Sequence, residues 1–463
     1  MSLKLPEQVW RGREFTCIHA AVLFADIQNS VLISSALSLA DYDRLIDEFQ
    51  TVMMALCDIL REQGMPVGEV QVVGDQMSVF FYNPAEVQRN WELDGLRPVS
   101  GARRERTIKE CGESNCQLVY NALKAAIQFK NMWLAERFNI ERVYHHHSPF
   151  EVSIGIHYGR VFLRDRPDGQ RRIEGYNVSL GKRVQSTSQF GRYSLIMFGQ
   201  DACETLRSMV VAHTQLRQRV FFHHHEVPML DLKGVTKLLP IYELKFCHRI
   251  KVPLSEEAVR QHEEIFAVDP TRIWSYYQLV EHYGYDIGDW ERAYYLASRA
   301  QVMNPQDEKI KLDLSAYHFQ RGELHMAEIY CRQALQINPD FDLAYERLAM
   351  IANDRDDLPS LVECMRQAVS LSPGSAGNHR NLGLALANLK LYEEALEHLN
   401  RAVQLYPQYA ANNDLRKAVD EARRHASIPS QLDKHLRAAR RRRQAAKKAA
   451  PADQQAQGKQ QGN

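Results

Sequence analysis

An apolar run near the start of the chain leads directly into a carboxylate. Residues Ala20–Asn29 read AAVLFADIQN, and such a short run rich in β-formers predicts a buried central strand that ends at Asp26. The polar residues that follow, among them Asn29 and Ser30, are typical of a helix start. Backbone N–H groups that face outward at such a turn form a natural cradle for phosphate, so we expect Asn29 and Ser30 to contact a phosphorylated substrate. Asp26 itself can be a helix cap or a metal ligand.

A second carboxylate follows a second strand. Glu69–Tyr82 reads EVQVVGDQMSVFFY, two alternating strands joined at Gly74 and Asp75, which predicts a hairpin. Between the two stretches, apolar residues repeat at helical spacing from about Ser38 to Glu62. A strand–helix–hairpin unit can place Asp26 and Asp75 side by side, and two close carboxylates repel unless a cation or a proton lies between them. Hard oxygen ligands suit Mg²⁺ or Mn²⁺, which in turn suit a triphosphate.

The pattern up to about residue 250 continues to alternate between strands and helices. We expect a loop or insertion at 83–114, a helix at 116–138, a second hairpin at 150–164 and a charged turn at 164–172. A further helix is expected at 177–189, and three strands near 194–197, 220–227 and 239–244. Alternating strands and helices with paired hairpins predict an α+β, ferredoxin-like domain.

A strict repeat governs the second half of the chain. Prolines recur every 34 residues, at positions 305, 339, 373 and 407, each after a similar helical segment. A 34-residue helix–turn–helix repeat that ends in proline resembles the tetratricopeptide repeat. We expect four repeats over residues 274–409 that form an all-α solenoid, a scaffold for an unknown protein or peptide or an extension of a dimer.

Composition and charge narrow the class of protein. The 463 residues carry a net charge of +1, so there is no global basic field, and we expect no nucleic-acid partner. No apolar run reaches the length of about 18 residues that a membrane span needs, so we expect a cytoplasmic protein without a membrane partner. The eight cysteines form no CxxC pair and are expected to be reduced. Our expected domains are residues 1–250, a linker or half-repeat helix at 251–273, repeats and a capping helix at 274–425, and a basic, Gln-rich, disordered tail at 426–463.

Four short motifs in the first 250 residues resemble the class III nucleotidyl cyclases, the adenylate and guanylate cyclase homology domain. They are FADI, VGD, GIHYGRV and GYNVSLGKR, and they occur in the family's order. The resemblance implies two Mg²⁺ or Mn²⁺ ions per site, held by Asp26, Asp75 and the carbonyl of Ile27. It also implies that Arg183 stabilises the transition state, together with Ser179, which stands where the family has Asn.

The same resemblance implies further contacts. A phosphate-binding lysine is expected in the region of Lys233 and Lys237, without deciding between them. Because the family takes the metal-binding acids from one chain and the arginine from another, we expect a homodimer with two composite sites.

The base-reading positions depart from both purine patterns. Gln71 stands where adenylate cyclases have Lys and guanylate cyclases have Glu, and Arg172, or an immediate neighbour if the turn shifts register, stands at the second position. Arginine donors suit the carbonyl oxygens of uracil, which favours UTP over CTP. The combination looks like the bacterial Pycsar antiphage cyclases, which implies cyclic UMP as a signal in antiviral defence. Two alternatives remain open: an adenylate cyclase with an unusual pocket, and an inactive nucleotide-sensing scaffold that acts through its repeats.

Overall fold

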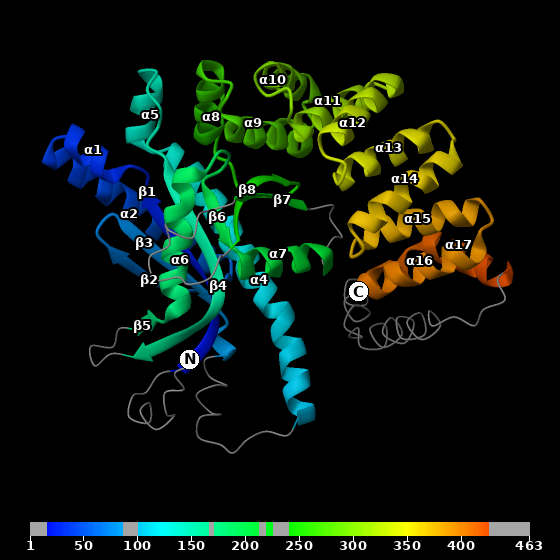
Figure 1. The fold of residues 1–463 in the computed structure, drawn as a ribbon, viewed down its shortest axis with the longest axis horizontal. Helices are drawn as coiled ribbons and strands as arrows, with labels where there is room; N and C mark the ends of the chain where they lie inside the picture. The colour runs from blue at the N-terminus through cyan, green and yellow to red at the C-terminus, as the bar shows by residue number, and fades with distance from the viewer. Residues whose placement is uncertain (1–15, 87–100, 166–170, 213–218, 226–239, 426–463) are drawn as a thin grey trace, which may run out of the picture. The chain divides into compact units, whose positions relative to one another are not determined.

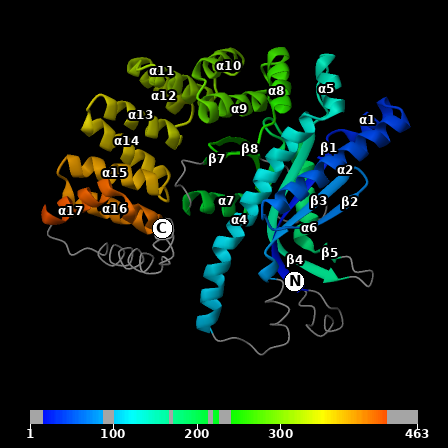
Figure 2. The ribbon, with the colours of Figure 1, turned by 180° about the vertical axis from the view of Figure 1, so that it is seen from behind.

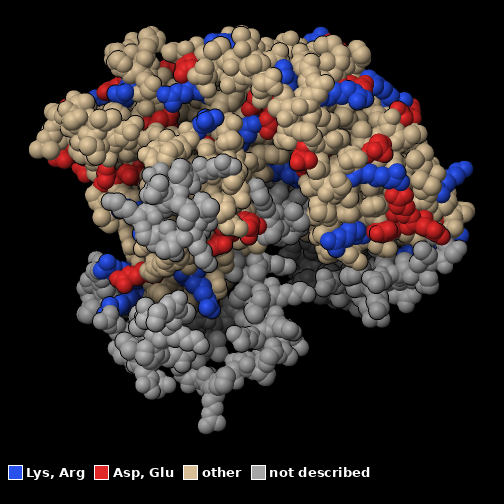
Figure 3. Space-filling model, viewed as in Figure 1, with Lys and Arg blue, Asp and Glu red and all other residues tan. Residues whose placement is uncertain are grey.

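The computed structural model describes residues 16–86, 101–165, 171–212, 219–225 and 240–425 (Figure 1). The chain forms two compact units. The N-terminal unit contains residues 1–210 and 218–305, and the C-terminal unit contains residues 211–217 and 306–463. On the face drawn in Figure 3, the described basic and acidic side chains are interspersed rather than gathered by sign.

An eight-stranded mixed sheet organises the N-terminal unit. The strand order is β2-β3-β1-β4-β6-β8-β7, with β5 paired to β4. The first four strands follow the order β2-β3-β1-β4 with antiparallel neighbours, and α2 and α4 connect them in a βαββαβ succession. This topology confirms the predicted α+β, ferredoxin-like domain. The strands are β1 (Thr16–Ile27), β2 (Val67–Val73), β3 (Gln76–Tyr82), β4 (Val152–Asp165), β5 (Arg171–Glu174), β6 (Ile196–Gly199), β7 (Arg219–His225) and β8 (Ile241–His248).

Helices cover both faces of this sheet. Helix α6 lies toward the viewer in Figure 1, and α4 lies toward the viewer in Figure 2, where the molecule is seen from behind. Phe49 of α2 meets the rings of Phe129 and Trp133 of α4 edge to face, at centroid distances of 5.4 and 5.5 Å, and so joins these two helices. The helices of the sheet domain are α1 (Ser30–Ala36), α2 (Leu39–Glu62), α4 (Gly101–Leu134), α5 (Arg137–Tyr144), α6 (Tyr176–Ser186), the 3₁₀ turn η2 (Thr187–Phe190) and α7 (Gln200–Ala212).

Four further helical segments belong to the N-terminal unit. They are α8 (Glu256–Val268), α9 (Ile273–Val280), the π-helix η5 (Glu281–Ile287) and α10 (Trp290–Met303). Buried Asn131 of α4 is within 3.3 Å of both His262 of α8 and Gln278 of α9. The ring of Phe246 on β8 lies 5.2 Å from that of Tyr277 on α9. Polar and apolar contacts therefore both fasten these helices to the sheet domain.

Helix pairs of constant spacing build the C-terminal unit. Helices α11, α13 and α15 begin at residues 308, 342 and 376, and α12, α14 and α16 begin at residues 324, 358 and 392, so both series advance by 34 residues. Ala334, Ala368 and Ala402 are fully buried where the helices pack. The predicted all-α repeat region is thereby confirmed. The helices are α11 (Glu308–Gln320), α12 (Leu324–Ile337), α13 (Asp342–Asp354), α14 (Leu358–Leu371), α15 (Ala376–Asn388), α16 (Tyr392–Leu405), η6 (Pro407–Ala411) and α17 (Asn413–His425).

Two expectations about secondary structure were wrong. Helix α4 begins at Gly101, so residues 101–114 of the loop expected at 83–114 are helix, because this charged stretch consists largely of good helix formers. The predicted second hairpin at 150–164 is the single strand β4, which pairs with β1 along twelve residues. Its alternation arises because one face contacts α6, and it needs no internal turn.

Three predictions lie outside the described residues. They concern Lys233, Lys237 and the tail at 426–463. Among the helices that the structure describes, none combines the length and the hydropathy that crossing a membrane requires.

The buried histidine between α8, α9 and α4 predicts a pH-dependent stability. His262 is within hydrogen-bond distance of Ser275 (3.1 Å) and Asn131 (3.3 Å), and burial lowers its pKa from 6.5 to about 3. Between these two pH values the unfolded chain binds a proton that the folded chain does not. Stability is therefore fully present above 6.5 and falls as the pH drops below it, by about 2 kcal/mol between pH 7.5 and 5.0.

Replacing this histidine should flatten that profile. We expect the free energy of unfolding of His262→Gln, measured in urea by tryptophan fluorescence, to depend less on pH than that of the native chain. The exposed His145→Gln should keep the native slope. Equal slopes for His262→Gln and the native chain would contradict a neutral buried imidazole.

Candidate functional site

Asp26 lies at the end of β1, in the middle of the sheet. It pairs with Gln76 on β3 and with Ser153 on β4, and its side chain is half-buried. The carboxylate accepts a hydrogen bond from the N–H of Ile27. Its Oδ1 atom is buried and has no hydrogen-bond partner among the described residues. Burial first, and the charge of Asp75 second, raise the pKa of Asp26 to about 6.

Asp75 reaches the same place from the neighbouring hairpin. It follows Gly74, whose φ of +63° is the left-handed conformation that favours glycine, in the tight turn between β2 and β3. The side chain of Gln50 on α2 donates a hydrogen bond to the Gly74 carbonyl at 3.1 Å and so ties the turn to the helix. Asp75 directly precedes Gln76, which pairs with Asp26, so the two acids lie on neighbouring strand ends, and the charge of Asp75 raises the pKa of Asp26.

Helix α6 packs unusually close to strands β1 and β4, beside Asp26. A Cβ at Gly155 would lie 2.4 Å from the backbone N of Gln185, and one at Gly181 would lie 2.8 Å from the ring of Phe24. Both positions therefore require glycine. The contact also places the buried Gln185 amide 2.7 Å from Ser153 Oγ, and that hydroxyl donates to the Asp26 carbonyl at 3.2 Å. The two glycines belong to the GIHYGRV and GYNVSLGKR motifs, which here have a packing role.

Three residues of α6 bear on the site in different ways. Lys182 lowers the pKa of Asp26 and thus opposes the effect of Asp75. Arg183, the next residue, is half-buried, and Ser179 is exposed one turn earlier. Because successive helix residues point about 100° apart, a helix that directs Lys182 toward Asp26 directs Arg183 elsewhere. Of the residues that the structure describes, the charged ones that act on Asp26 are Asp75 and Lys182, and Arg183 is not among them.

The turn after Asp26 brings hydroxyl groups to the acids. Asn29 has a φ of 60°, and its carbonyl accepts hydrogen bonds from the N–H groups of Leu32 and Ile33. Ser30 hydrogen-bonds Tyr42 in the first turn of α2, and burial first, then Asp75 and Asp26, raise the pKa of that phenol. Tyr42 thus lies near both carboxylates, although no sequence pattern pointed to it.

The two positions expected to read the base lie on opposite faces of the sheet. Gln71 on β2 pairs with Ser78 on β3, which in turn pairs with Phe24 on β1, so all three side chains lie on the α6 face of the sheet. The buried Nε2 of Gln71 has no hydrogen-bond partner among the described residues. Arg172 is exposed and pairs with Glu174 at 2.8 Å. Its neighbour Ile173 joins the core cluster on the α6 face, so Arg172 points to the opposite face.

Arg171 shares the face of Ile173 and approaches β2. It lies 3.9 Å from Glu69 and hydrogen-bonds Tyr82, and Tyr82 also donates to Glu69 at 3.1 Å. Burial, with Glu69, raises the pKa of Tyr82 to about 12, so the phenol stays protonated. Of the two arginines in the turn, Arg171 is therefore the one that shares a face with Gln71.

The two acids could hold a divalent cation. A half-buried carboxylate oxygen without a partner, beside a second carboxylate, is a donor set that a hard cation satisfies. No group of three or more His, Cys, Asp or Glu side chains suited to a metal occurs in the part of the chain that the structure describes. Any ion here would therefore be completed by backbone carbonyls, water or substrate oxygens.

Comparisons with known proteins give the following similarities. A family model for the tetratricopeptide repeat matches residues 376–409, and no curated protein matches the chain. Among solved structures, the adenylyl cyclase CyaB from P. aeruginosa aligns at 16% identity over 51% of this chain and 98% of that chain, with a TM-score of 0.36. The guanylyl cyclase domain of the RhoGC fusion protein from Blastocladiella emersonii aligns at 15% identity over 50% and 96%, with a TM-score of 0.31. MamA aligns at 20% identity over 34% and 91%, with a TM-score of 0.30.

Proposed function

We propose that the protein is a class III nucleotidyl cyclase that converts a nucleoside triphosphate to its 3′,5′-cyclic monophosphate and pyrophosphate. The observation that carries the proposal is the pairing of Asp26 and Asp75, with a buried carboxylate oxygen left unpartnered. The four sequence motifs supply the reaction class, and each of them has residues in this region of the sheet or in the helix packed on it.

Asp26, Asp75 and the Ile27 carbonyl would hold Mg²⁺ or Mn²⁺. Two such ions would lower the pKa of the ribose 3′-hydroxyl and neutralise the triphosphate. Lys182 favours the ionised form of Asp26, which is the form that binds a cation. Ser153 fixes the Asp26 main chain through its 3.2 Å hydrogen bond, and the turn at Asn29 and Ser30 would receive phosphate oxygens.

Two copies of the chain would complete each site. Lys182 is directed at the acids of its own chain, which leaves Arg183 free to serve the acids of a twofold-related partner. There the guanidinium would offset negative charge that grows on the α-phosphate, and Ser179 would position a ribose or phosphate oxygen.

We propose a pyrimidine substrate, with UTP preferred and cyclic UMP as product. The amide of Gln71 has a buried donor without a partner, and a uracil carbonyl would satisfy it. Arg171, on the same face, offers further donors to the base edge or the ribose, whereas Arg172 points away. A role as the signal generator of bacterial antiphage defence follows from the resemblance to the Pycsar cyclases and rests on that resemblance alone.

The repeats are proposed to bind a protein or peptide. A cavity of about 390 Å³ lies between α13, α14 and α15, and its lining mixes apolar side chains such as Met350, Leu361 and Met365 with the amides of Asn353 and Asn381. This mixture suits an extended segment that presents both apolar side chains and backbone groups.

Purified protein tested with each of the four NTPs and Mn²⁺ should release pyrophosphate with UTP above all. In Asp26→Asn we expect the rate to fall by at least about 100-fold with the fold intact, because one cation ligand is lost. Fast turnover of ATP would instead indicate an adenylate cyclase, and no turnover of any NTP would favour an inactive scaffold. Undiminished activity of Asp26→Asn would refute the metal role.

A mixture of two inactive variants tests the composite site. Asp75→Ala and Arg183→Ala should each be inactive, and equal amounts that exchange subunits should recover about a quarter of the native activity, since half the dimers gain one intact site. An assay of cyclic product before and after mixing measures this. Activity that does not recover, although subunit exchange is verified by mass, would count against sites shared between chains.

Neighbouring arginines provide a matched pair for substrate recognition. Arg171→Ala should raise KM for UTP by about tenfold, because a charged donor near the base edge is lost. Arg172→Ala, which removes an exposed side chain paired with Glu174, should change KM by less than about twofold. The reverse order of effects would show that the register of β5 in the active dimer differs from that described.

A further inference from the structure

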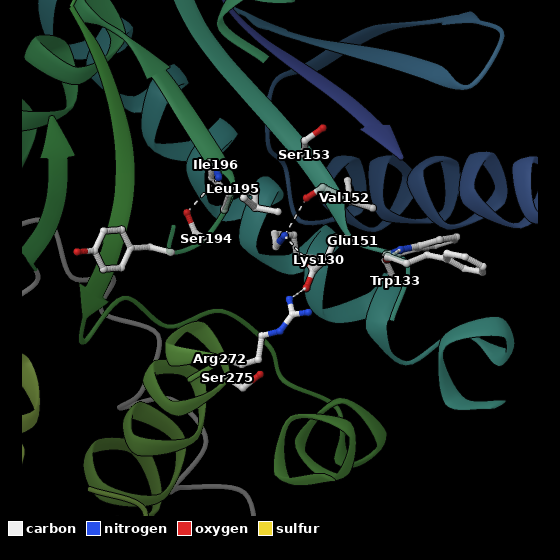
Figure 4. A network of polar contacts seen from close by, with 12 residues as sticks. Lys130, Trp133, Glu151, Val152, Ser153, Ser194, Leu195, Ile196, Arg272 and Ser275 are labelled. Atoms are coloured by element: carbon white, nitrogen blue, oxygen red, sulfur yellow. Dashed lines mark hydrogen bonds and ion pairs between the residues drawn. The ribbon is translucent and has the colours of Figure 1, made fainter. Parts of the chain in front are cut away.

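A cavity of about 250 Å³ lies within the N-terminal unit, and its lining includes Gln28, two residues after Asp26. Its walls come from α4, the start of β4, the segment at 191–195, and helices α8 and α9. Figure 4 shows side chains from α4, β4 and α9 converging there, with Glu151 between Lys130 and Arg272. None of these residues belongs to the motifs that define the proposed cyclase site.

Among the residues that line this cavity, basic side chains outnumber acidic ones. Lys130, Arg192 and Arg272 line it against the single carboxylate of Glu151. Burial lowers the pKa of Lys130, and behind the lining the buried Glu243 carboxylate accepts the N–H groups of Arg192 and Tyr193. Lys130 Nζ donates to the Val152 carbonyl at 2.8 Å and lies 3.4 Å from Glu151, and Arg272 lies 3.0 Å from the same carboxylate. One anion is thus shared by two cations, while Arg192 is exposed at the rim. His262 also lines the cavity, and burial keeps it neutral.

A buried donor in the lining lacks a partner. Trp274 is 9% exposed, and its indole Nε1–H has no hydrogen-bond partner among the described residues. The other tryptophan in the lining, Trp133, donates to the Phe150 carbonyl at 2.6 Å. A buried N–H without an acceptor is unfavourable, and a ligand oxygen would satisfy it.

Apolar and aromatic side chains also line the cavity, together with the polar Gln28, Thr271 and Ser275. Trp133, Leu134, Phe150, Ile265 and Ile273 contribute to it beside the charged groups. A ligand that used both parts of the cavity would combine an anionic head with a compact apolar body. Inorganic phosphate lacks the body, and a second negative charge would face Glu151.

We propose that this cavity binds a small organic carboxylate with a flat, apolar body. Its carboxylate would accept the Trp274 N–H and face the basic side chains of Lys130, Arg192 and Arg272. The apolar body would lie against Trp133 and Phe150. Binding at this site requires no nucleotide, so a test of it does not depend on the proposed cyclase activity.

Benzoate is a suitable probe, with the neutral isostere benzamide and inorganic phosphate as comparisons. Because two of the five tryptophans line the cavity, titration of the full chain at constant ionic strength can be followed by tryptophan emission and by Tm. We expect a saturable response and a rise in Tm with benzoate. A response that is absent, matched by benzamide or stronger with phosphate would overturn the proposal.

Variants locate the response. Trp274→Phe keeps an aromatic ring but removes the donor, and it should weaken the Kd for benzoate by about tenfold. Arg192→Gln changes an exposed side chain, so it tests the charge without endangering the fold, and it should weaken the Kd several-fold. Trp290→Phe, on α10 outside the cavity, is the matched control and should bind like the native chain. Unchanged affinity in both Trp274→Phe and Arg192→Gln would place the bound benzoate elsewhere and overturn the proposal.

Discussion

The closeness of helix α6 to the central strands is the constraint on which the rest of the site depends. A side chain at Gly155 or Gly181 would occupy space already filled by Gln185 or Phe24. Without that approach the Gln185 amide could not meet Ser153, and Lys182 would not lie near Asp26. The position of one helix therefore sets both the main chain and the charge around the half-buried acid.

Periodicity was enough to predict both halves of the fold. The 34-residue recurrence of proline and alanine specified the helix pairs, because each repeat packs by the same small residues. The strand–helix–hairpin order specified the ferredoxin-like core. Alternation could not reveal that residues 150–164 form one long strand, because a single strand and the two strands of a hairpin both alternate with a period of two. The first turns of α4 could not be predicted either, because a charged stretch without apolar periodicity is compatible with both a helix and a loop.

The candidate site was only partly accessible from sequence. A carboxylate at the end of an apolar strand and another in a Gly-Asp turn can be recognised from spacing alone, and the structure places Asp26 and Asp75 together. Which arginine faces Gln71 depends on the pairing of β5 with β4, and a shift of one residue exchanges the faces. Lys182 lies within the GYNVSLGKR motif, but its effect on Asp26 depends on the packing of α6 against the sheet. Tyr42 reaches the acids only through the tertiary position of α2.

Glu151 makes two contacts, a main-chain hydrogen bond and an ion pair, that limit how such a protein can evolve. Its carbonyl accepts the N–H of Gln28, two residues from Asp26, and its carboxylate pairs with Arg272 at the start of α9. A gene fusion or deletion with its junction near residue 250 would remove Arg272, the ion-pair partner of Glu151. It would also expose Phe246, which packs against Tyr277. The sheet domain is therefore not a freely exchangeable module, and recombination that preserves it has to carry the helices up to about Pro305 along.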